Sequence, residues 1–167
     1  MFRNASRSLT TADEVYEYAL SLLDRREYGE KELVQKLRRC CSSTALIREV
    51  VDRLKQYDLI NEERYALRVF EFWRGKKIYG RLHLQAELLK KQVDDAYIPV
   101  ILEMLSEEEE MCRLKAAYRL IALRKDKKYD CSTEKGTASL IRYLSARGFG
   151  PSMIRSGLAL AREEDEE

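Results

Sequence analysis

The sequence predicts an all-α protein, and three observations support this. The 167 residues include only 7 Gly and 2 Pro, charged residues make up 36% and hydrophobic residues 45%, a composition typical of an almost entirely helical chain. Apolar residues recur every three or four positions, as on one face of a helix. A helix-start pattern also occurs three times. We therefore expect about nine helices and no sheet.

The helix-start pattern is an aromatic residue, then Gly, then aliphatic residues four and eight positions after the Gly. Its copies are Tyr28-Gly29 with Leu33 and Leu37, Tyr79-Gly80 with Leu84 and Leu88, and Phe149-Gly150 with Ile154 and Leu158. With Gly as the N-cap, the aromatic residue and the first aliphatic residue can pack as a hydrophobic staple. We expect Leu33, Leu84 and Ile154 to be buried against Tyr28, Tyr79 and Phe149. Three such starts predict repeated helical units.

The first unit covers residues 12–60. Thr11 and Glu14 have the spacing of a capping box, which predicts a first helix from that point. The second helix begins after Gly29 and ends near the turn at residues 40–43. The third helix has its apolar residues on one face: Leu46, Ile47, Val50, Val51 and Leu54.

The second unit covers residues 61–105. Asn61 is a good N-cap, and the helix after it has an apolar face that ends at Trp73. A break at residues 74–77 precedes the helix that follows Gly80. A last helix is expected to open at Asp94 or Asp95, with Pro99 near its first turn.

The third unit covers residues 106–161. Ser106 and Glu109 have the spacing of a second capping box, and residues 124–136 are expected to form a long irregular connection. The next helix should have an apolar face at Ala138, Ile141, Leu144 and Ser145, and Gly148 suits its C-terminal turn. Pro151 fits the first position of the last helix. Residues 162–167, of which the last five are acidic, are expected to form a disordered tail.

Units of this size bury little surface alone, so neighbouring units should pack side by side. We expect an elongated, curved array of three tandem three-helix repeats. One compact helical bundle is the competing architecture.

Several classes of protein are disfavoured. No apolar run approaches the ~18 residues of a membrane span, and the first residues lack a secretory apolar core, so a cytoplasmic protein without a membrane partner is expected. The four cysteines have no CxxC spacing and are interpreted as reduced thiols. His83, the only histidine, has no metal-spaced partner. With no phosphate loop or catalytic motif either, we expect no enzyme, metal or cofactor.

Four signatures in this order resemble the RecX family of bacterial recombination regulators, over residues 12–160. They are Ala19-Leu20 with Leu22-Leu23, Arg25-Arg26-Glu27-Tyr28, Glu32-Leu33 and Lys36-Leu37; Val51 and Leu54 with Leu59-Ile60-Asn61-Glu62 and Arg64-Tyr65-Ala66; Lys77 with Tyr79-Gly80, Leu84 and Glu87-Leu88; and Tyr143-Leu144 with Arg147-Gly148-Phe149-Gly150, Ile154 and Leu158. The chain departs from the family pattern at Gly29 and Gly150, where Ser is common. Asp58 stands where Gly is usual.

The resemblance implies a three-helix repeat protein that binds the RecA filament on DNA. It implies an inhibitor that limits filament extension, ATP hydrolysis and strand exchange, in homologous recombination, DNA repair and the SOS response. It implies neither a catalytic centre nor a cofactor. We expect a monomer. The alternative is a helical nucleic-acid-binding protein whose main partner is DNA itself; otherwise direct DNA binding would be weak.

The charge distribution is compatible with both functions. The net charge is +2, but leaving out the nine acids of Glu107–Glu110 and Glu163–Glu167 gives the remainder a charge of +11. Such a body suits DNA phosphates or an acidic filament groove. Two basic clusters are the contact candidates: Arg74, Lys76, Lys77 and Arg81, with no acid inside that segment, and Lys115, Arg119, Arg124, Lys125, Lys127 and Lys128.

Other basic and aromatic residues have structural explanations. Lys90 and Lys91 are interpreted as cations that favour the helix C-terminus. Trp73 and Tyr79 could stack on bases, but both are interpreted as core residues because they continue apolar patterns.

Overall fold

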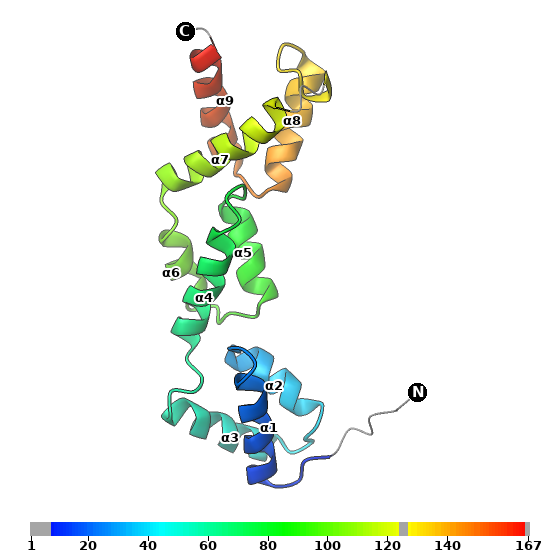
Figure 1. The fold of residues 1–167 in the computed structure, drawn as a ribbon, viewed down its shortest axis with the longest axis vertical. Helices are drawn as coiled ribbons and strands as arrows, with labels where there is room; N and C mark the ends of the chain where they lie inside the picture. Colours follow the sequence, from blue (N-terminus) through cyan, green and yellow to red (C-terminus); the bar gives the residue numbers. More distant parts are fainter. Residues whose placement is uncertain (1–7, 124–126, 166–167) are drawn as a thin grey trace, which may run out of the picture. The chain divides into compact units, whose positions relative to one another are not determined.

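The computed structural model describes residues 8–123 and 127–165, with side chains up to residue 160. These residues form nine α-helices and one 3₁₀ helix, without any β-strand (Figure 1), which confirms the predicted fold class. The α-helices are α1 Ala12–Leu23, α2 Glu30–Arg38, α3 Thr44–Gln56, α4 Glu62–Arg74, α5 Arg81–Lys90, α6 Ile98–Glu103, α7 Glu107–Ala122, α8 Glu134–Ala146 and α9 Pro151–Asp165. Among them, none is both long and apolar enough to cross a membrane.

The contacts divide the chain into two compact units. Unit 1 combines Met1–Arg68 with Lys90–Tyr97, and unit 2 combines Val69–Leu89 with Ile98–Glu167. Residues 61–105, the predicted second repeat, therefore contribute to both units. The division into three repeats stays a prediction of the sequence.

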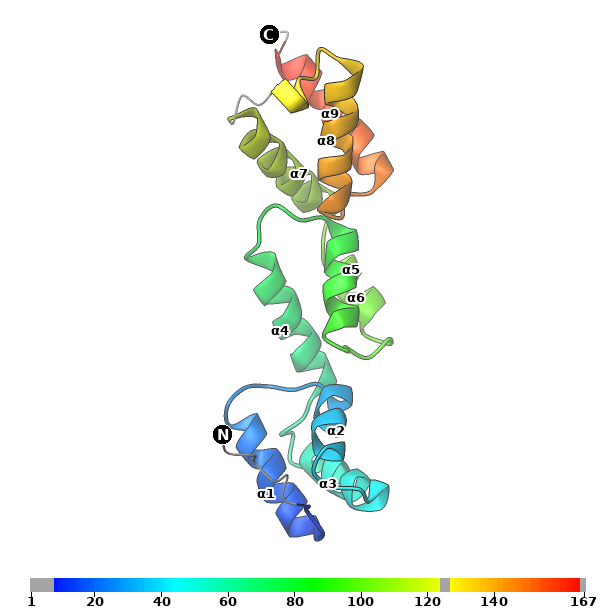
Figure 2. The ribbon, with the colours of Figure 1, turned by 90° about the vertical axis from the view of Figure 1, so that its right-hand side faces the viewer.

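The core of unit 1 lies between α1, α2 and α3 (Figure 2). Val15 and Ala19 of α1 meet Leu33 and Leu37 of α2, and all four are fully buried. The apolar face of α3 closes this core, with Ile47, Val50, Val51 and Leu54 buried. Tyr28 lies in the same cluster as Leu33, as the first staple predicts. The Thr11–Glu14 capping box is also present.

A distant carboxylate caps α2. Gly29 is the N-cap residue and has no side chain to accept a hydrogen bond. The amide N–H of Glu30 instead donates to the Glu62 carboxylate, from the first turn of α4. A Cβ at position 29 would lie 2.7 Å from Cε1 of Tyr65, so a larger residue here would force the Tyr65 side chain to move. The helix start is therefore completed by a residue 32 positions away.

Two helices end in the same left-handed turn. After α3, Asp58 has φ 53°, and after α8, Gly148 has φ 81°. In both turns two backbone N–H groups donate back to the last helical turn, at Leu54 and Lys55 or at Leu144 and Ser145, which is the Schellman pattern. The predicted role of Gly148 is confirmed. Asp58 takes the conformation that glycine adopts most easily.

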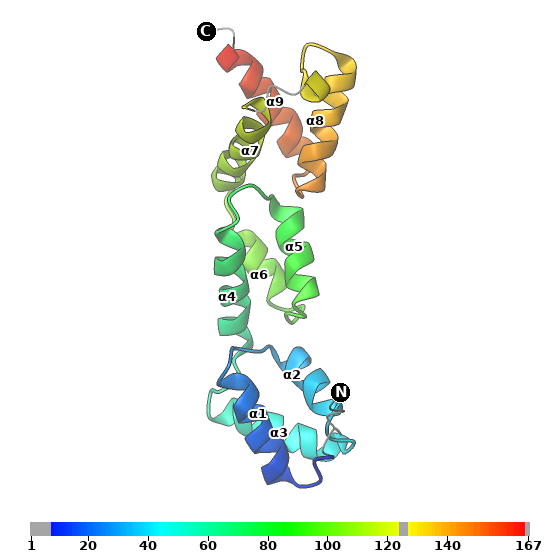
Figure 3. The same ribbon diagram turned by 45° about the vertical axis from the view of Figure 1, so that its right-hand side comes forward.

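The described core of unit 2 joins α7, α8 and α9 (Figure 3). Phe149 and Ile154 are both buried in it, which agrees with the third staple. In the second staple Leu84 is fully buried as predicted, whereas Tyr79 is half-buried and packs on the His83 ring, with 4.1 Å between centroids. Trp73 is 1% exposed, which confirms its interpretation as a core residue.

Several helix boundaries differ from the prediction. The last helix of residues 61–105 begins at Ile98, not at Asp94 or Asp95. Asp94 forms a local turn, in which its carboxylate accepts from the N–H of Ala96 at 3.0 Å. This turn competes with helix formation at residues 94–97, which come directly before α6. Ser106 caps α7, but the predicted capping box is only half present, because the Glu109 carboxylate binds arginines instead.

The long connection is shorter than expected, since α8 already begins at Glu134. Gly136 permits this start, because a Cβ there would lie 1.9 Å from the Asp130 carbonyl oxygen. The predicted apolar face of α8 was wrong in part. Ala138, Ile141 and Ser145 are exposed. The buried residues are Gly136, Ser139, Leu140 and Leu144.

At the C-terminus, α9 continues through Asp165. The helix thus includes the first four residues of the tail 162–167 that was expected to be disordered. Glu166 and Glu167 lie outside the described residues.

Candidate interaction surface

The first predicted contact cluster lies at the end of α4 and the start of α5, inside unit 2. It contains Arg74, Lys76, Lys77 and Arg81. The sequence places no acid between residues 74 and 81, but the fold brings acids from α5 and α7 to this cluster. Three of the four cations form ion pairs with them.

Arg74 belongs to a network centred on Glu109. Its guanidinium donates to both Glu109 oxygens, at 3.1 and 3.0 Å. The buried Arg113 donates to the same carboxylate at 2.8 Å and to the Arg74 carbonyl oxygen at 2.9 Å. Burial alone would raise the pKa of Glu109, but the hydrogen bonds from Arg113 and Arg74 outweigh it and lower that pKa. Glu109 is therefore held as an anion between two guanidinium groups.

Arg81 is a structural residue. Its amide N–H donates to the Glu110 carboxylate at 2.8 Å, and its Nε donates to the other Glu110 oxygen at 3.3 Å. Its terminal nitrogens donate to the carbonyl oxygens of Leu102 and Leu105. Glu110 is 4% exposed, so this pair connects α5 to α7 inside the unit. As at α2, a glutamate from a later helix caps a helix that begins after glycine.

The remaining two cations of this cluster differ in their surroundings. Lys76 is half-buried and pairs with Glu87 at 3.3 Å. Lys77 is exposed, and no ion pair includes it within the described residues. A hollow of about 360 Å³ lies beside it, lined also by Arg74, Glu109 and Arg113. Lys77 is therefore the cation of this cluster that is available to a partner.

A hydrogen bond between Trp73 and His83 connects α4 and α5 across the turn that joins them. The indole Nε1 of Trp73 donates to Nδ1 of His83 at 2.9 Å, and the Arg113 guanidinium lies 4.4 Å from the indole ring centre. A side chain held in this way is not exposed for stacking on a base.

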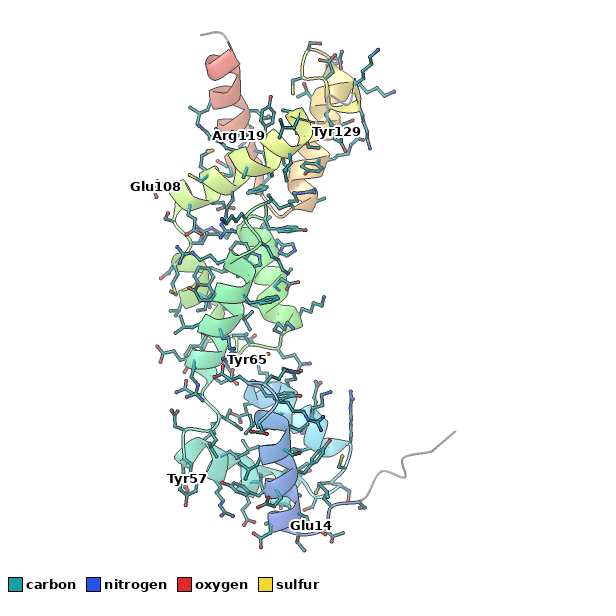
Figure 4. All side chains as sticks on the ribbon, viewed as in Figure 1. Glu14, Tyr57, Tyr65, Glu108, Arg119 and Tyr129 are labelled. Carbon is teal, nitrogen blue, oxygen red and sulfur yellow. The ribbon has the colours of Figure 1, made fainter. Side chains whose placement is uncertain are left out.

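The second predicted cluster is only partly described, because Arg124 and Lys125 lie outside the described residues. Lys115 is half-buried, whereas Arg119, Lys127 and Lys128 are exposed; Lys128 lies 5.3 Å from the ring centre of Tyr129. Arg119 and Tyr129 are labelled in Figure 4.

Two exposed leucines accompany Arg119 at the end of α7. Leu120 is 41% exposed and Leu123 is 79% exposed. Leu123 comes four residues after Arg119 and three after Leu120, so it neighbours both on the helix surface. A cation beside exposed apolar side chains is a composition suited to a protein contact.

Sequence reasoning missed the roles of Glu109, Glu110 and Arg113. Glu109 and Glu110 were counted as part of an acidic helix start, although they neutralise the basic turn. The i,i+4 spacing of Glu109 and Arg113 is a local signal of one of these pairs. No local signal indicates Arg81 as the partner of Glu110, because 29 residues separate them.

Comparisons with known proteins agree with this fold. The sequence profile described as "RecX, first three-helix domain" matches residues 16–54. "Regulatory protein RecX" from Pseudomonas fluorescens is 32% identical over 163 residues, which is 95% of this chain and 97% of that protein. The same-named protein of Pseudomonas entomophila (strain L48) is 33% identical over 149 residues, which is 89% of this chain and 92% of that protein.

Among solved structures, the chain is similar to the crystal structure of RecX from Lactobacillus salivarius. The TM-score is 0.75 at 21% identity, over 89% of this chain and 94% of that one. This likeness supports the helical fold. The relatives above 30% identity, matched along nearly their whole length, show that the chain belongs to the RecX family.

Proposed function

We propose that this protein binds the RecA filament on DNA and inhibits it, by limiting filament extension, ATP hydrolysis and strand exchange. The observation that carries this proposal is the full-length similarity to proteins named "Regulatory protein RecX". Those names describe regulators, which agrees with the expectation that the chain has no catalytic role.

The surface of unit 2 supports a protein contact. Lys77, Arg119 and Lys127 are exposed cations, and no ion pair includes them among the described residues. Leu120 and Leu123 add exposed apolar surface next to Arg119. Arg74 and Arg81 are less suitable contacts because their charges are already paired with Glu109 and Glu110. We therefore assign the filament contact to the three exposed cations and the two leucines.

The test measures RecA ATP hydrolysis on single-stranded DNA at increasing concentrations of the protein. We expect the wild type to inhibit. A variant with Lys77→Glu, Arg119→Glu and Lys127→Glu should need at least about ten times more protein for the same inhibition, since each reversal at an interface costs affinity. Reversing Arg81 is unsuitable, because it would place a carboxylate beside buried Glu110.

The control reverses the same number of exposed charges elsewhere, at Arg48, Lys135 and Arg155, which no described ion pair includes. It should inhibit like the wild type. If the wild type leaves RecA ATP hydrolysis and strand exchange unchanged, the proposed function is wrong. If both triple variants inhibit equally well, the assigned contact surface is wrong.

A further inference from the structure

A second basic site lies in unit 1, whereas the clusters described above belong to unit 2. It is a hollow of about 240 Å³ between the C-terminal part of α2 and the segment Lys90–Tyr97. Four cations line it: Lys36, Arg39, Lys90 and Lys91. Lys36 is half-buried and the other three are exposed, and no ion pair includes any of them within the described residues.

The acids near this hollow are already paired with other cations. Glu32 lies on its wall, but Arg26 donates to both its oxygens, at 3.0 and 2.6 Å. Asp94 and Asp95 follow Lys91 in the chain and lie 3.9 and 3.8 Å from Nζ of Lys31. The charge of Lys91 helps to lower the pKa of Glu32, after the hydrogen bonds from Arg26, but none of the four cations of the hollow forms an ion pair with these carboxylates.

The backbone that presents Lys90 and Lys91 is anchored to the unit. The Tyr65 hydroxyl, labelled in Figure 4, donates to the Lys91 carbonyl oxygen at 3.1 Å. The N–H of Asp94 donates to the Glu62 carboxylate at 3.4 Å, and the same carboxylate caps α2. Glu62 of α4 therefore links α2, on one side of the hollow, to the segment Lys90–Tyr97 on the other side. Compensation of the helix dipole explains a lysine at the end of α5. It does not require Lys90 and Lys91 to line the same hollow as Lys36 and Arg39.

The lining also indicates the kind of ligand. The other residues of the wall are Glu32 and the glutamines at 35 and 92, so no hydrophobic or aromatic side chain is present. Protein partners usually gain affinity from apolar or aromatic anchors, which this wall does not offer. A phosphate group needs only positive charge and hydrogen-bond donors, and the arginine fork matches its oxygens.

We infer that the hollow formed by Lys36, Arg39, Lys90 and Lys91 binds the phosphodiester backbone of DNA. The inference deepens the proposed function and rests on it, because a RecA filament contains DNA that a bound regulator can reach. It assigns the DNA contact to unit 1 and the protein contact to unit 2. Binding of this kind does not depend on base sequence, since only the backbone is contacted.

The DNA-binding test omits RecA, so its result is separable from that of the proposed function. A separate assay measures binding of the same variants to RecA without DNA. Binding of the full chain to a labelled oligothymidylate, and to a mixed-sequence duplex, is measured by fluorescence anisotropy between about 50 and 200 mM salt. The pocket variant carries Lys36→Gln, Arg39→Gln, Lys90→Gln and Lys91→Gln. The control variant removes four exposed charges elsewhere, with Arg38→Gln, Arg48→Gln, Lys135→Gln and Arg155→Gln.

For the single strand, the logarithmic salt slope of the pocket variant should be smaller by up to about 2.8, since each lost contact removes about 0.7. Over this salt range the wild type should then lose roughly 50-fold more affinity than the pocket variant. The control variant should keep most of the wild-type slope. Circular dichroism checks that both variants are folded. A pocket variant with alanine in place of glutamine at the same four positions should give the same salt slope.

Three results would overturn the inference. One is an equal loss of slope in both variants, or no loss in either. Another is binding of inorganic phosphate that the pocket variant loses while its DNA binding stays unchanged, which would indicate a site for a small phosphate. The last is unchanged DNA binding by the pocket variant together with lost binding to RecA alone, which would indicate an acidic protein surface as the ligand.

Discussion

Replacing Gly148 by Ala should destabilise unit 2, because two independent costs meet at this residue. Its φ of 81° lies in the left-handed region, where an L side chain costs roughly 1–2 kcal/mol. An added Cβ would also lie 2.2 Å from the His83 backbone nitrogen and 2.6 Å from the His83 Cβ. Backbone atoms cannot rotate away as a side chain can. Overpacking of this kind typically costs about 1–3 kcal/mol.

The expected loss in the free energy of unfolding is therefore about 2–5 kcal/mol. The displaced turn also carries two hydrogen bonds, from Gly80 N–H to the Arg147 carbonyl and from Leu82 N–H to the Gly148 carbonyl, both 2.9 Å. If the turn moves to relieve the contact, these hydrogen bonds weaken. The free energy of unfolding lost in that way is part of the same total of about 2–5 kcal/mol, at about 1 kcal/mol for each bond.

Urea unfolding followed by Trp73 fluorescence measures this loss. Trp73 is the only tryptophan and is 1% exposed in unit 2, so its signal reports that unit. Gly150→Ala is the matched control, because a Cβ there meets no atom within 4 Å, and the weaker N-cap costs at most about 1 kcal/mol. A loss below about 1 kcal/mol for Gly148→Ala, or one equal to the control, would refute the reasoning.

Three further predictions concern the core and the paired acids. Leu84 is fully buried, so Leu84→Ala should cost roughly 2–5 kcal/mol in urea unfolding; a loss under about half a kcal/mol would show that this repeat position is not core. Hydrogen bonds from Arg26 lower the pKa of Glu32, and those from arginines lower the pKa of Glu109 against the effect of burial. Since both folded pKa values lie below the unfolded value of about 4.3, their stabilisation is present above that pH and lost as pH falls through the folded pKa. In Glu109→Gln the free energy of unfolding should therefore fall less steeply as the pH is lowered below about 4.3. An unchanged pH dependence would contradict the lowered pKa of Glu109. Burial raises the pKa of Tyr65 to about 12, so the stability linked to its neutral form should decline above the unfolded pKa of about 10; spectrophotometric titration against Tyr65→Phe should show one late-ionising tyrosine fewer.

The sequence by itself determined the number and type of the helices. Periodic apolar residues mark a buried helical face whichever partner covers it, so the face of α3 and the burial of Leu33, Leu84 and Ile154 could be predicted. The glycine of each staple also marked a helix start, although the carboxylates that cap α2 and α5 come from later helices and carry no local signal. Where local signals were weak, as in α8, the predicted face was wrong in part, with Leu144 buried but Ala138, Ile141 and Ser145 exposed.

Tertiary structure decided which charges are free. Arg74 and Arg81 looked available because no acid lies inside the segment 74–81, yet α7 brings Glu109 and Glu110 within hydrogen-bond distance. Conversely, Lys90 and Lys91 looked like ordinary helix-end cations until the fold placed them beside Lys36 and Arg39. Charge pairing depends on which helices pack together. That packing is set by contacts across tens of residues, so a local pattern does not contain it.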